Sequence, residues 1–319
     1  MNSFEAGLRP YEFLGLKGRY GHWAANNTDA KRTFVLILGQ HATIERGRPI
    51  VEALQEFGDV YIADNPGFGG MESSYKVGRY PDLTFFGEHV RHFIENYTDQ
   101  NRKLTIFGIS FGFQVAVEAL HHYPELSERV EDVVSFVGFV SHHDFHITFS
   151  YSAGLIYILA NIGRTWLGSE FLKFVMKERL IVGVYQLTKP IQVKFKHLKS
   201  EEAKRYAKEQ AYLWVVNDIR THGATAWDLA RRSDQSAYRL DTPLLHIGVP
   251  NDHMFDNKLV VSQLQEMFPV TVSVDLQLEN HAPLDVDTAD SILGLLPEEA
   301  KAMFAKSHNQ VAITRVVLE

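Results

Sequence analysis

The chain of 319 residues contains no cysteine. This absence excludes structural disulfides, thiolate metal ligands and a cysteine nucleophile. The chain also lacks an excess of basic residues, because its formal net charge at neutral pH is −7. Proteins that bind nucleic acid as their main partner usually carry a basic surface, so we do not expect that class of partner.

Long hydrophobic runs are missing as well. The longest apolar stretches, such as residues 133–140 and 153–160, are far shorter than the roughly 20 residues that a membrane-spanning helix needs. Residues 1–9 do not show a basic segment followed by an apolar one, so no signal peptide is expected. We therefore expect a cytoplasmic protein without an integral membrane segment. Its 45% apolar residues suffice for a large core.

Short apolar runs alternate with segments of helical periodicity over much of the chain. Strands are expected at residues 33–38, 59–63, 104–107, 130–140, 243–248 and 270–278, and an antiparallel pair within 11–23. Helices are expected at residues 50–57, 82–97, 113–120, 258–268 and, as the last, 288–295. Alternation of this kind predicts an α/β fold with a mostly parallel, doubly wound sheet.

The pattern changes after residue 142. Residues from about 147 to 238 show long helical periodicities and no clear strand. We interpret this block as a helical cap, or lid, inserted after the strand that ends near Val140. The predicted domains are a sheet core of residues 1–141 and 241–319 and a cap of residues 142–240.

Residues 108–112 read Gly-Ile-Ser-Phe-Gly and lie between an expected strand and an expected helix. A strand, a Gly-x-Ser-x-Gly turn and a helix together are typical of a nucleophile elbow. The glycines let strand and helix approach closely, while the central residue is held in a strained backbone conformation. We therefore predict that Ser110 is a nucleophile at a helix N-terminus, where backbone N–H groups favour a developing negative charge.

A serine hydroxyl needs a base that takes its proton and a third group that orients the base. Both partners are expected on loops at the carboxyl ends of strands. Asp252 follows the strand that ends at Gly248, and His281 follows the strand that ends near Leu278. These two residues are the predicted acid and base.

With these residues identified, the chain resembles the α/β-hydrolase superfamily with an inserted cap. Leu38-Gly39-Gln40 stands where that family has its His-Gly turn, with leucine in place of the histidine. Asp64-Asn65-Pro66-Gly67-Phe68-Gly69 is similar to the family's Asp-x-Pro-Gly-x-Gly turn. The resemblance covers roughly residues 30–141 and 241–297, and it implies the α/β-hydrolase fold.

The resemblance also implies site residues. The backbone N–H groups of Gln40 and Phe111 would form the oxyanion hole, and an acyl-enzyme would form on Ser110. The loop that ends at Asp252 is one residue longer than the commonest spacing, so Asp144 and Asp256 are held in reserve as the acid. Related dehalogenases and epoxide hydrolases carry aspartate at the elbow, so the serine argues against those chemistries.

The first third of the cap is rich in aromatic residues, and some of them would line an apolar acyl pocket while others pack the cap helices. The candidates for substrate contact are His41, Phe145 and Phe149. The histidines of residues 142–146 are better explained as a polar loop than as a metal site, because no partner at helical spacing completes a ligand set. No metal and no cofactor are therefore expected.

Residues 172–208 carry ten Lys or Arg against three Glu, a net charge of +7 within a chain of −7. A solvated helix face explains such a stretch. The alternative is a weak contact with an anionic surface or carrier.

These features predict a serine carboxylesterase for a small to medium ester with an apolar acyl group. A thioesterase, lactonase, amidase or C–C bond hydrolase would use the same triad and stays open. A hydrolase-like binding protein without catalysis is the alternative from another class.

Overall fold

A computed structural model describes residues 4–27, 30, 32–146, 154–175, 208–209, 211–276 and 288–306. Eight strands within them form one sheet in the order β1-β2-β4-β3-β5-β6-β7-β8. The strands are β1 (Leu8–Phe13), β2 (Leu16–Trp23), β3 (Arg32–Ile37), β4 (Gly58–Ala63), β5 (Leu104–Ile109), β6 (Val130–Phe136), β7 (Leu244–Gly248) and β8 (Thr271–Asp275). The pairs from β4 to β8 are parallel, and β1 and β2 add an antiparallel edge. The predicted, mostly parallel sheet is confirmed.

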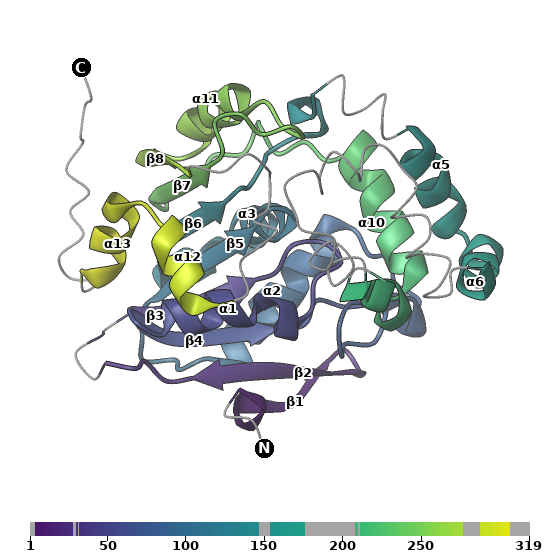
Figure 1. The fold of residues 1–319 in the computed structure, drawn as a ribbon, viewed down its shortest axis with the longest axis horizontal. Helices are drawn as coiled ribbons and strands as arrows, with labels where there is room; N and C mark the ends of the chain where they lie inside the picture. Colours follow the sequence, from purple (N-terminus) through teal and green to yellow (C-terminus); the bar gives the residue numbers. More distant parts are fainter. Residues whose placement is uncertain are drawn as a thin grey trace.

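Helices cover both faces of the sheet (Figure 1). Side chains from each set of helices form a separate apolar cluster. One cluster includes residues of α2 (Leu83–Tyr97), α3 (Phe111–His122) and α11 (Asn257–Met267). The other includes residues of α1 (Ile44–Leu54), α12 (Ala289–Leu295) and α13 (Glu298–Ala305). Because both faces are covered, β3 is buried along its whole length, which explains its unbroken apolar run.

Helix α1 begins earlier than its sequence pattern predicts. The expected helix covered residues 50–57, whereas α1 starts at Ile44 and ends at Leu54. Thr43 caps it by accepting a hydrogen bond from the N–H of Arg46. Pro49 lies inside the helix, although a proline ordinarily interrupts the hydrogen-bond ladder. The helix therefore begins before this proline and continues past it.

Two other expectations are wrong: the end of one strand and the identity of the last helix. Strand β6 ends at Phe136 rather than near Val140, because Val137 adopts a positive φ of 47° that leaves the extended conformation. Residues 137, 139 and 140 are nevertheless buried, so their apolar character does not signal the end of the strand. The helix at 289–295 is not the last one, because α13 follows it.

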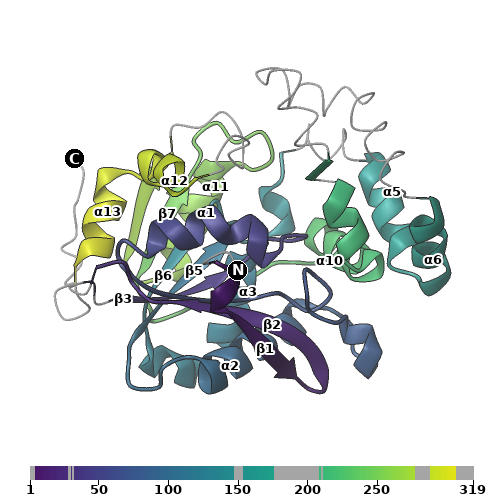
Figure 2. The same cartoon turned by 60° about the horizontal axis from the view of Figure 1, so that its bottom comes forward.

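The described elements between β6 and β7 are helical. They include the one-turn helix η4 (His142–Asp144), α5 (Gly154–Gly163), α6 (Trp166–Val175) and α10 (Ile219–Arg231). Helix α10 lies between the sheet part and the pair α5 and α6, which form the outer edge of the molecule (Figures 1 and 2). We call α5, α6 and α10 the cap helices. The cap boundaries at residues 142 and 240 stay a prediction.

None of the helices in the described part of the chain is long and apolar enough to cross a membrane.

Candidate active site

The turn between β5 and α3 holds Ser110 in a strained conformation. Its backbone has φ 50° and ψ −115°, a region that residues other than glycine rarely adopt. The Ser110 N–H donates to the carbonyl oxygen of Phe136 at 2.9 Å, which ties the turn to β6. The side chain does not form the N-cap hydrogen bond of α3, although Ser110 stands at the N-cap position. A capping role therefore does not account for this serine.

The glycines on both sides of Ser110 are required by the space around them. A Cβ at Gly108 would lie 2.6 Å from the Cα of Phe113, within the helix that follows. A Cβ at Gly112 would lie 2.2 Å from the carbonyl oxygen of Ile37 in β3. Both separations are shorter than real contacts, so only glycine lets strand and helix meet this closely.

The turn after β3 lies beside this elbow. A Cβ at Gly39 would stand 3.8 Å from the Cβ of Ser110 and 3.3 Å from the carbonyl oxygen of Ile109. Gln40 and His41 continue this turn, and His41 has a positive φ of 64°. We call residues 39–41 the Gly39 turn. Gly39, the residue before Gln40, therefore lies against the elbow.

Helix α10 of the cap holds the side chain of Gln40. The Nε2 of Gln40 donates to Thr225 Oγ1 at 2.7 Å and to the carbonyl oxygen of His222 at 3.3 Å. Thr225 is buried within α10. Residues of this cap helix therefore hold the side chain of Gln40, which the resemblance assigns to the oxyanion hole.

Asn217, just before α10, holds two loops of the sheet core. Its Nδ2 donates to the carbonyl oxygen of His41 at 3.0 Å, and its Oδ1 accepts the N–H of Gly69 at 2.7 Å. The N–H of the next residue, Asp218, donates to the carbonyl oxygen of Gly67 at 2.8 Å. Asn217 is 4% exposed, so water competes little for these bonds. We call this pair of residues the Asn217 clamp.

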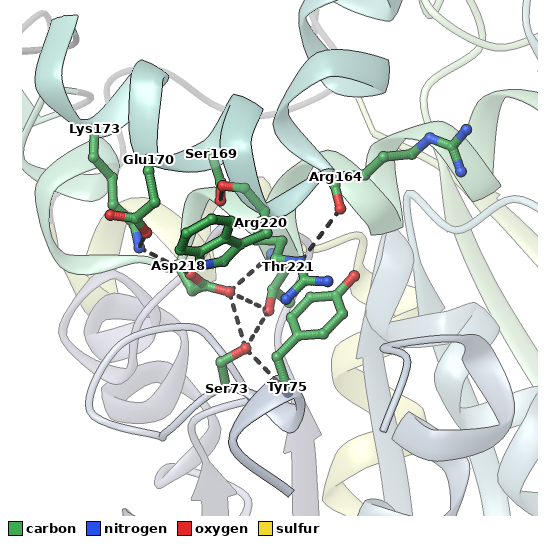
Figure 3. A network of polar contacts seen from close by, with 10 residues as sticks. Ser73, Tyr75, Arg164, Ser169, Glu170, Lys173, Asp218, Arg220 and Thr221 are labelled. Atoms are coloured by element: carbon green, nitrogen blue, oxygen red, sulfur yellow. Dashed lines mark hydrogen bonds and ion pairs between the residues drawn. The ribbon is translucent and has the colours of Figure 1, made fainter. Parts of the chain in front are cut away.

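A polar network extends from the clamp over the surface of the core (Figure 3). Asp218 accepts hydrogen bonds from Ser73 Oγ at 2.9 Å and from Thr221 Oγ1 at 2.7 Å. The guanidinium of Arg220 lies over the ring of Tyr75, with its Cζ 3.7 Å from the ring centroid. Charged and aromatic groups thus join the base of the cap to Ser73 and Tyr75 of the core.

The turn at residues 64–70 is ordered from within by its own aspartate. Asp64 accepts hydrogen bonds from the N–H groups of Ile44 at 2.9 Å and Gly70 at 2.8 Å and pairs with Arg19 at 2.7 Å. Burial raises the pKa of Asp64, while the ion pair with Arg19 opposes that shift. This geometry assigns Asp64 to positioning the turn.

Two histidines meet at the joint between the Gly39 turn and α10. The ring centroids of His41 and His222 lie 4.3 Å apart, and each lies 4.6 Å from that of Trp214. Burial, helped by His222 and Arg46, holds the pKa of His41 well below 6.5, and burial lowers that of His222 to about 4. His41 Nε2 and His222 Nδ1 are buried and have no protein partner. Both rings are therefore neutral at pH 7.

The predicted acid lies on the loop that follows β7. Asp252 is 6% exposed, and its Oδ1 accepts the N–H of Met254 at 2.8 Å. The carbonyl oxygen of Asp252 lies 3.1 Å from His146 Nε2. His281 falls outside the described residues, so the pairing of base and acid stays a prediction.

The two reserve acids bond to nearby backbone. Asp144 is fully buried and accepts the N–H groups of Val140 at 2.7 Å and Ser141 at 2.9 Å, and Gln263 Nε2 at 3.0 Å. Burial raises the pKa of Asp144, and the hydrogen bonds from Val140 and Ser141 act against that shift. Asp256 caps α11. These contacts explain both residues as local stabilisers of loop and helix.

The other predicted contacts have different surroundings. Phe145 packs on Phe139 and Phe255, with ring centroids 5.6 and 4.5 Å away. The backbones of Phe145 and Phe255 form an isolated bridge, so Phe145 joins the start of the cap to the acid loop. Phe149 lies outside the described residues. Phe111, whose N–H is the other proposed oxyanion donor, directly follows Ser110 and is the first residue of α3.

The side chains of His142 and His146 contact backbone carbonyl groups. His142 Nδ1 lies 2.9 Å from the carbonyl oxygen of Ser233, and His146 contacts Asp252 as described above. No group of histidine, aspartate and glutamate suited to a metal ion occurs among the residues that the structure describes.

The sequence patterns did not identify the residues of α10 that hold the Gly39 turn. Asn217-Asp218 before a helical run is an N-cap signal, and Asp218 does cap α10. That signal predicts where the helix starts but does not reveal that Asn217, Thr225 and His222 reach loops more than 140 residues away in sequence.

No protein-family model matches this sequence, and no curated protein matches it. Solved structures do match. A hydrolase from Pseudomonas aeruginosa has a TM-score of 0.63 at 16% identity, covering 94% of this chain and 98% of that one. An esterase from a Rhodococcus species has a TM-score of 0.61 at 14% identity, covering 94% and 99%, and an epoxide hydrolase has 0.62 at 16%, covering 93% and 98%. The chain therefore has the α/β-hydrolase fold.

Proposed function

We propose that the protein is a serine hydrolase that cleaves a carboxylic ester of small to medium size with an apolar acyl group. The observation that carries the proposal is the strained backbone of Ser110 on the β5–α3 turn, beside the Gly39 turn. Strain of this kind has a cost, and it is typical of residues whose side chain must be presented to a substrate. The hydrolases and esterases among the structures of similar fold support the same class of reaction.

In the proposed reaction, Ser110 Oγ attacks the ester carbonyl carbon while His281 takes the hydroxyl proton. The N–H groups of Gln40 and Phe111 stabilise the resulting oxyanion, and Asp252 orients His281. Collapse of this intermediate breaks the bond to the alcohol, which leaves with the proton from His281. Water, deprotonated by His281, then attacks the acyl-enzyme, releasing the acid and restoring the serine.

The Asn217 clamp gives this mechanism a positioning element from the cap. An oxyanion hole works only when its donors are fixed before the charge develops. The carbonyl of His41 and the side chain of Gln40 are both held by residues of the α10 region. Docking of α10 would therefore hold the Gln40 N–H in place.

The direct test is Ser110→Ala, assayed with p-nitrophenyl acyl esters of increasing chain length. We expect turnover to vanish, and activity within about tenfold of wild type would contradict the proposal. Ser127→Ala, at an exposed serine, is the matched control. A fluorophosphonate probe should label the folded wild type at Ser110, whereas a binding protein without catalysis would stay unlabelled.

The identity of the acid has its own test. Asp252→Asn should lower kcat by several orders of magnitude with little change in melting temperature. Asp144→Asn should instead lower the melting temperature, because Asp144 accepts two backbone N–H groups in a buried site. The reverse result would assign the acid to Asp144.

A thioester on an anionic carrier is the second candidate. The net charge of +7 in residues 172–208 favours it, because such a carrier would be attracted to the cap. Comparing acyl-CoA thioesters with neutral esters of the same acyl group separates the candidates, since added salt should weaken only the reaction of the charged substrate.

A further inference from the structure

The segment that follows η4 runs beside the acid loop, by which we mean residues 249–256 between β7 and α11. The N–H of His146 donates to the carbonyl oxygen of Met254 at 2.9 Å. The N–H of Asp256 donates to the carbonyl oxygen of Asp144 at 2.8 Å, and the isolated bridge of the two phenylalanines lies between these bonds. The two segments therefore pair as a short antiparallel ladder.

The side chain of His146 adds a further bond beyond this ladder. Its Nε2 lies 3.1 Å from the carbonyl oxygen of Asp252. A carbonyl oxygen can only accept a hydrogen bond, so Nε2 carries the hydrogen and donates. His146 thus holds the acid loop at two points, with its backbone at Met254 and with its ring at Asp252.

These two points are the ones that set the direction of the Asp252 carboxylate. Asp252 is 6% exposed, and its Oδ1 accepts the N–H of Met254 at 2.8 Å. The place of the carboxylate therefore depends on the backbone at Asp252 and Met254, and His146 holds the carbonyl groups of both.

A second histidine approaches the carboxylate itself. The Nδ1 of His253 lies 4.0 Å from Asp252 Oδ1, and His253 is exposed. That separation is longer than a hydrogen bond, and an exposed ion pair contributes little to stability. The backbone contacts of His146 are therefore the stronger constraint on the loop.

We propose that His146 is a positioning residue for the acid of the triad. The inference rests on the proposed function, in which Asp252 orients the base. Without the Nε2–H donor the acid loop can shift, and a misplacement of about 1 Å in a catalytic arrangement can cost about 100-fold in rate. His146 would then hold the acid from the start of the cap, as the Asn217 clamp holds the Gly39 turn.

The experiment compares two substitutions of His146. His146→Phe keeps an aromatic ring but loses the donor, whereas His146→Gln places an amide N–H group near the position of the imidazole Nε2. With p-nitrophenyl esters we expect His146→Phe to lower kcat by about 10- to 100-fold with little change in KM, and His146→Gln to recover most of this loss. His143→Ala, at an exposed histidine three residues away, is the matched control and should match wild type.

The pH profile separates positioning from a general loss of folded enzyme. A carboxylate close to the base raises the pKa of that imidazole, so a displaced Asp252 carboxylate lowers it. The acid limb of kcat/KM should therefore move to lower pH in His146→Phe and keep its place in His146→Gln. A partly unfolded enzyme would lose activity without this shift.

A double variant tests whether His146 acts through Asp252. In the Asp252→Asn background, His146→Phe should lower the residual rate by less than about twofold. Additive losses, or equal losses for His146→Phe and His146→Gln, would overturn the inference. An unchanged kcat in His146→Phe beside a large loss in Asp252→Asn would overturn it and leave the proposed function in place. An unchanged kcat in Asp252→Asn would overturn both this inference and the assignment of the acid.

Discussion

The sheet core and the cap helices differ in how far their apolar side chains are buried. In the core, Val35, Ile106 and Val133 are almost completely buried between two layers of helices. In the cap, Trp166 and Leu167 are mostly exposed, although α5 and α6 are as apolar as many core elements. Burial between layers thus accounts for the sequence of the core, whereas the outer cap helices have an apolar surface that packing among the described residues does not explain.

The two regions meet at the candidate site. The core contributes Ser110 and the Gly39 turn, and the cap contributes the Asn217 clamp that holds this turn. The comparison therefore predicts that substitutions at buried positions of the core reduce stability, those at the joint lower the rate of reaction, and those at exposed apolar positions of α6 affect neither.

The largest effect is expected at Gly112 in the core. In Gly112→Ala the new methyl group would lie 2.2 Å from the carbonyl oxygen of Ile37, so the elbow must distort. We expect a loss of about 3 kcal/mol or more in the free energy of unfolding, together with loss of ester hydrolysis. Gly154→Ala in the cap is the control, because nothing lies within 4 Å of its new methyl group. Its free energy of unfolding, measured in urea, should change by less than about 1 kcal/mol. Equal effects would remove the contrast between the regions.

At the joint, Asn217→Ala should lower kcat by about 10- to 100-fold with a smaller change in KM, because the Gly39 turn loses its hydrogen bond at His41. Asn217→Asp keeps the acceptor for Gly69 but loses the donor to His41, so it should resemble the alanine variant in kcat. Asn96→Ala, on the exposed surface of α2, is the control and should match wild type. An unchanged kcat in both Asn217 variants would show that the clamp does not position the oxyanion hole.

The joint should also respond to acid. An unfolded histidine titrates near pH 6.5, and burial lowers the pKa of His222 to about 4. The unfolded state therefore binds the proton first, so the stability contributed by neutral His222 is complete above about pH 7 and decreases as the pH falls from 6.5 toward 4. The free energy of unfolding, measured in urea, should therefore fall over this range by about 1–3 kcal/mol less for His222→Phe than for wild type. His121→Phe, at an exposed histidine, should keep the wild-type slope.

The smallest effect is expected on the outer side of α6. Leu167→Ala should change the free energy of unfolding by less than about 0.5 kcal/mol, because Leu167 is 72% exposed. Leu172→Ala, on the same helix but 8% exposed, should cost about 2 kcal/mol. Thermal unfolding of the two variants tests the orientation of α6 directly, and a larger loss for Leu167 would show that the exposed face is in fact packed.

Much of the fold could be predicted because buried parallel strands produce mostly apolar runs, as in β3, β5 and β7. The strained elbow could also be predicted, since its glycines are a local requirement of the turn, and the positive φ of Ser110 confirms it. The start of α1 could not, because Pro49 ordinarily interrupts a helix and does not do so here. The assignment of His281 as the base stays a prediction.

The sequence by itself determined the alternation of strands and helices, the position of Ser110 in a strand–turn–helix motif and the net charge of residues 172–208. Each of these features depends only on residues that are neighbours in the sequence. Only the tertiary structure decided that Asn217 and Thr225 hold the Gly39 turn, that Gln263 bonds to Asp144 and that Leu167 of α6 is exposed. These features depend on contacts or burial that form when distant segments pack together, and a local pattern carries no record of that packing.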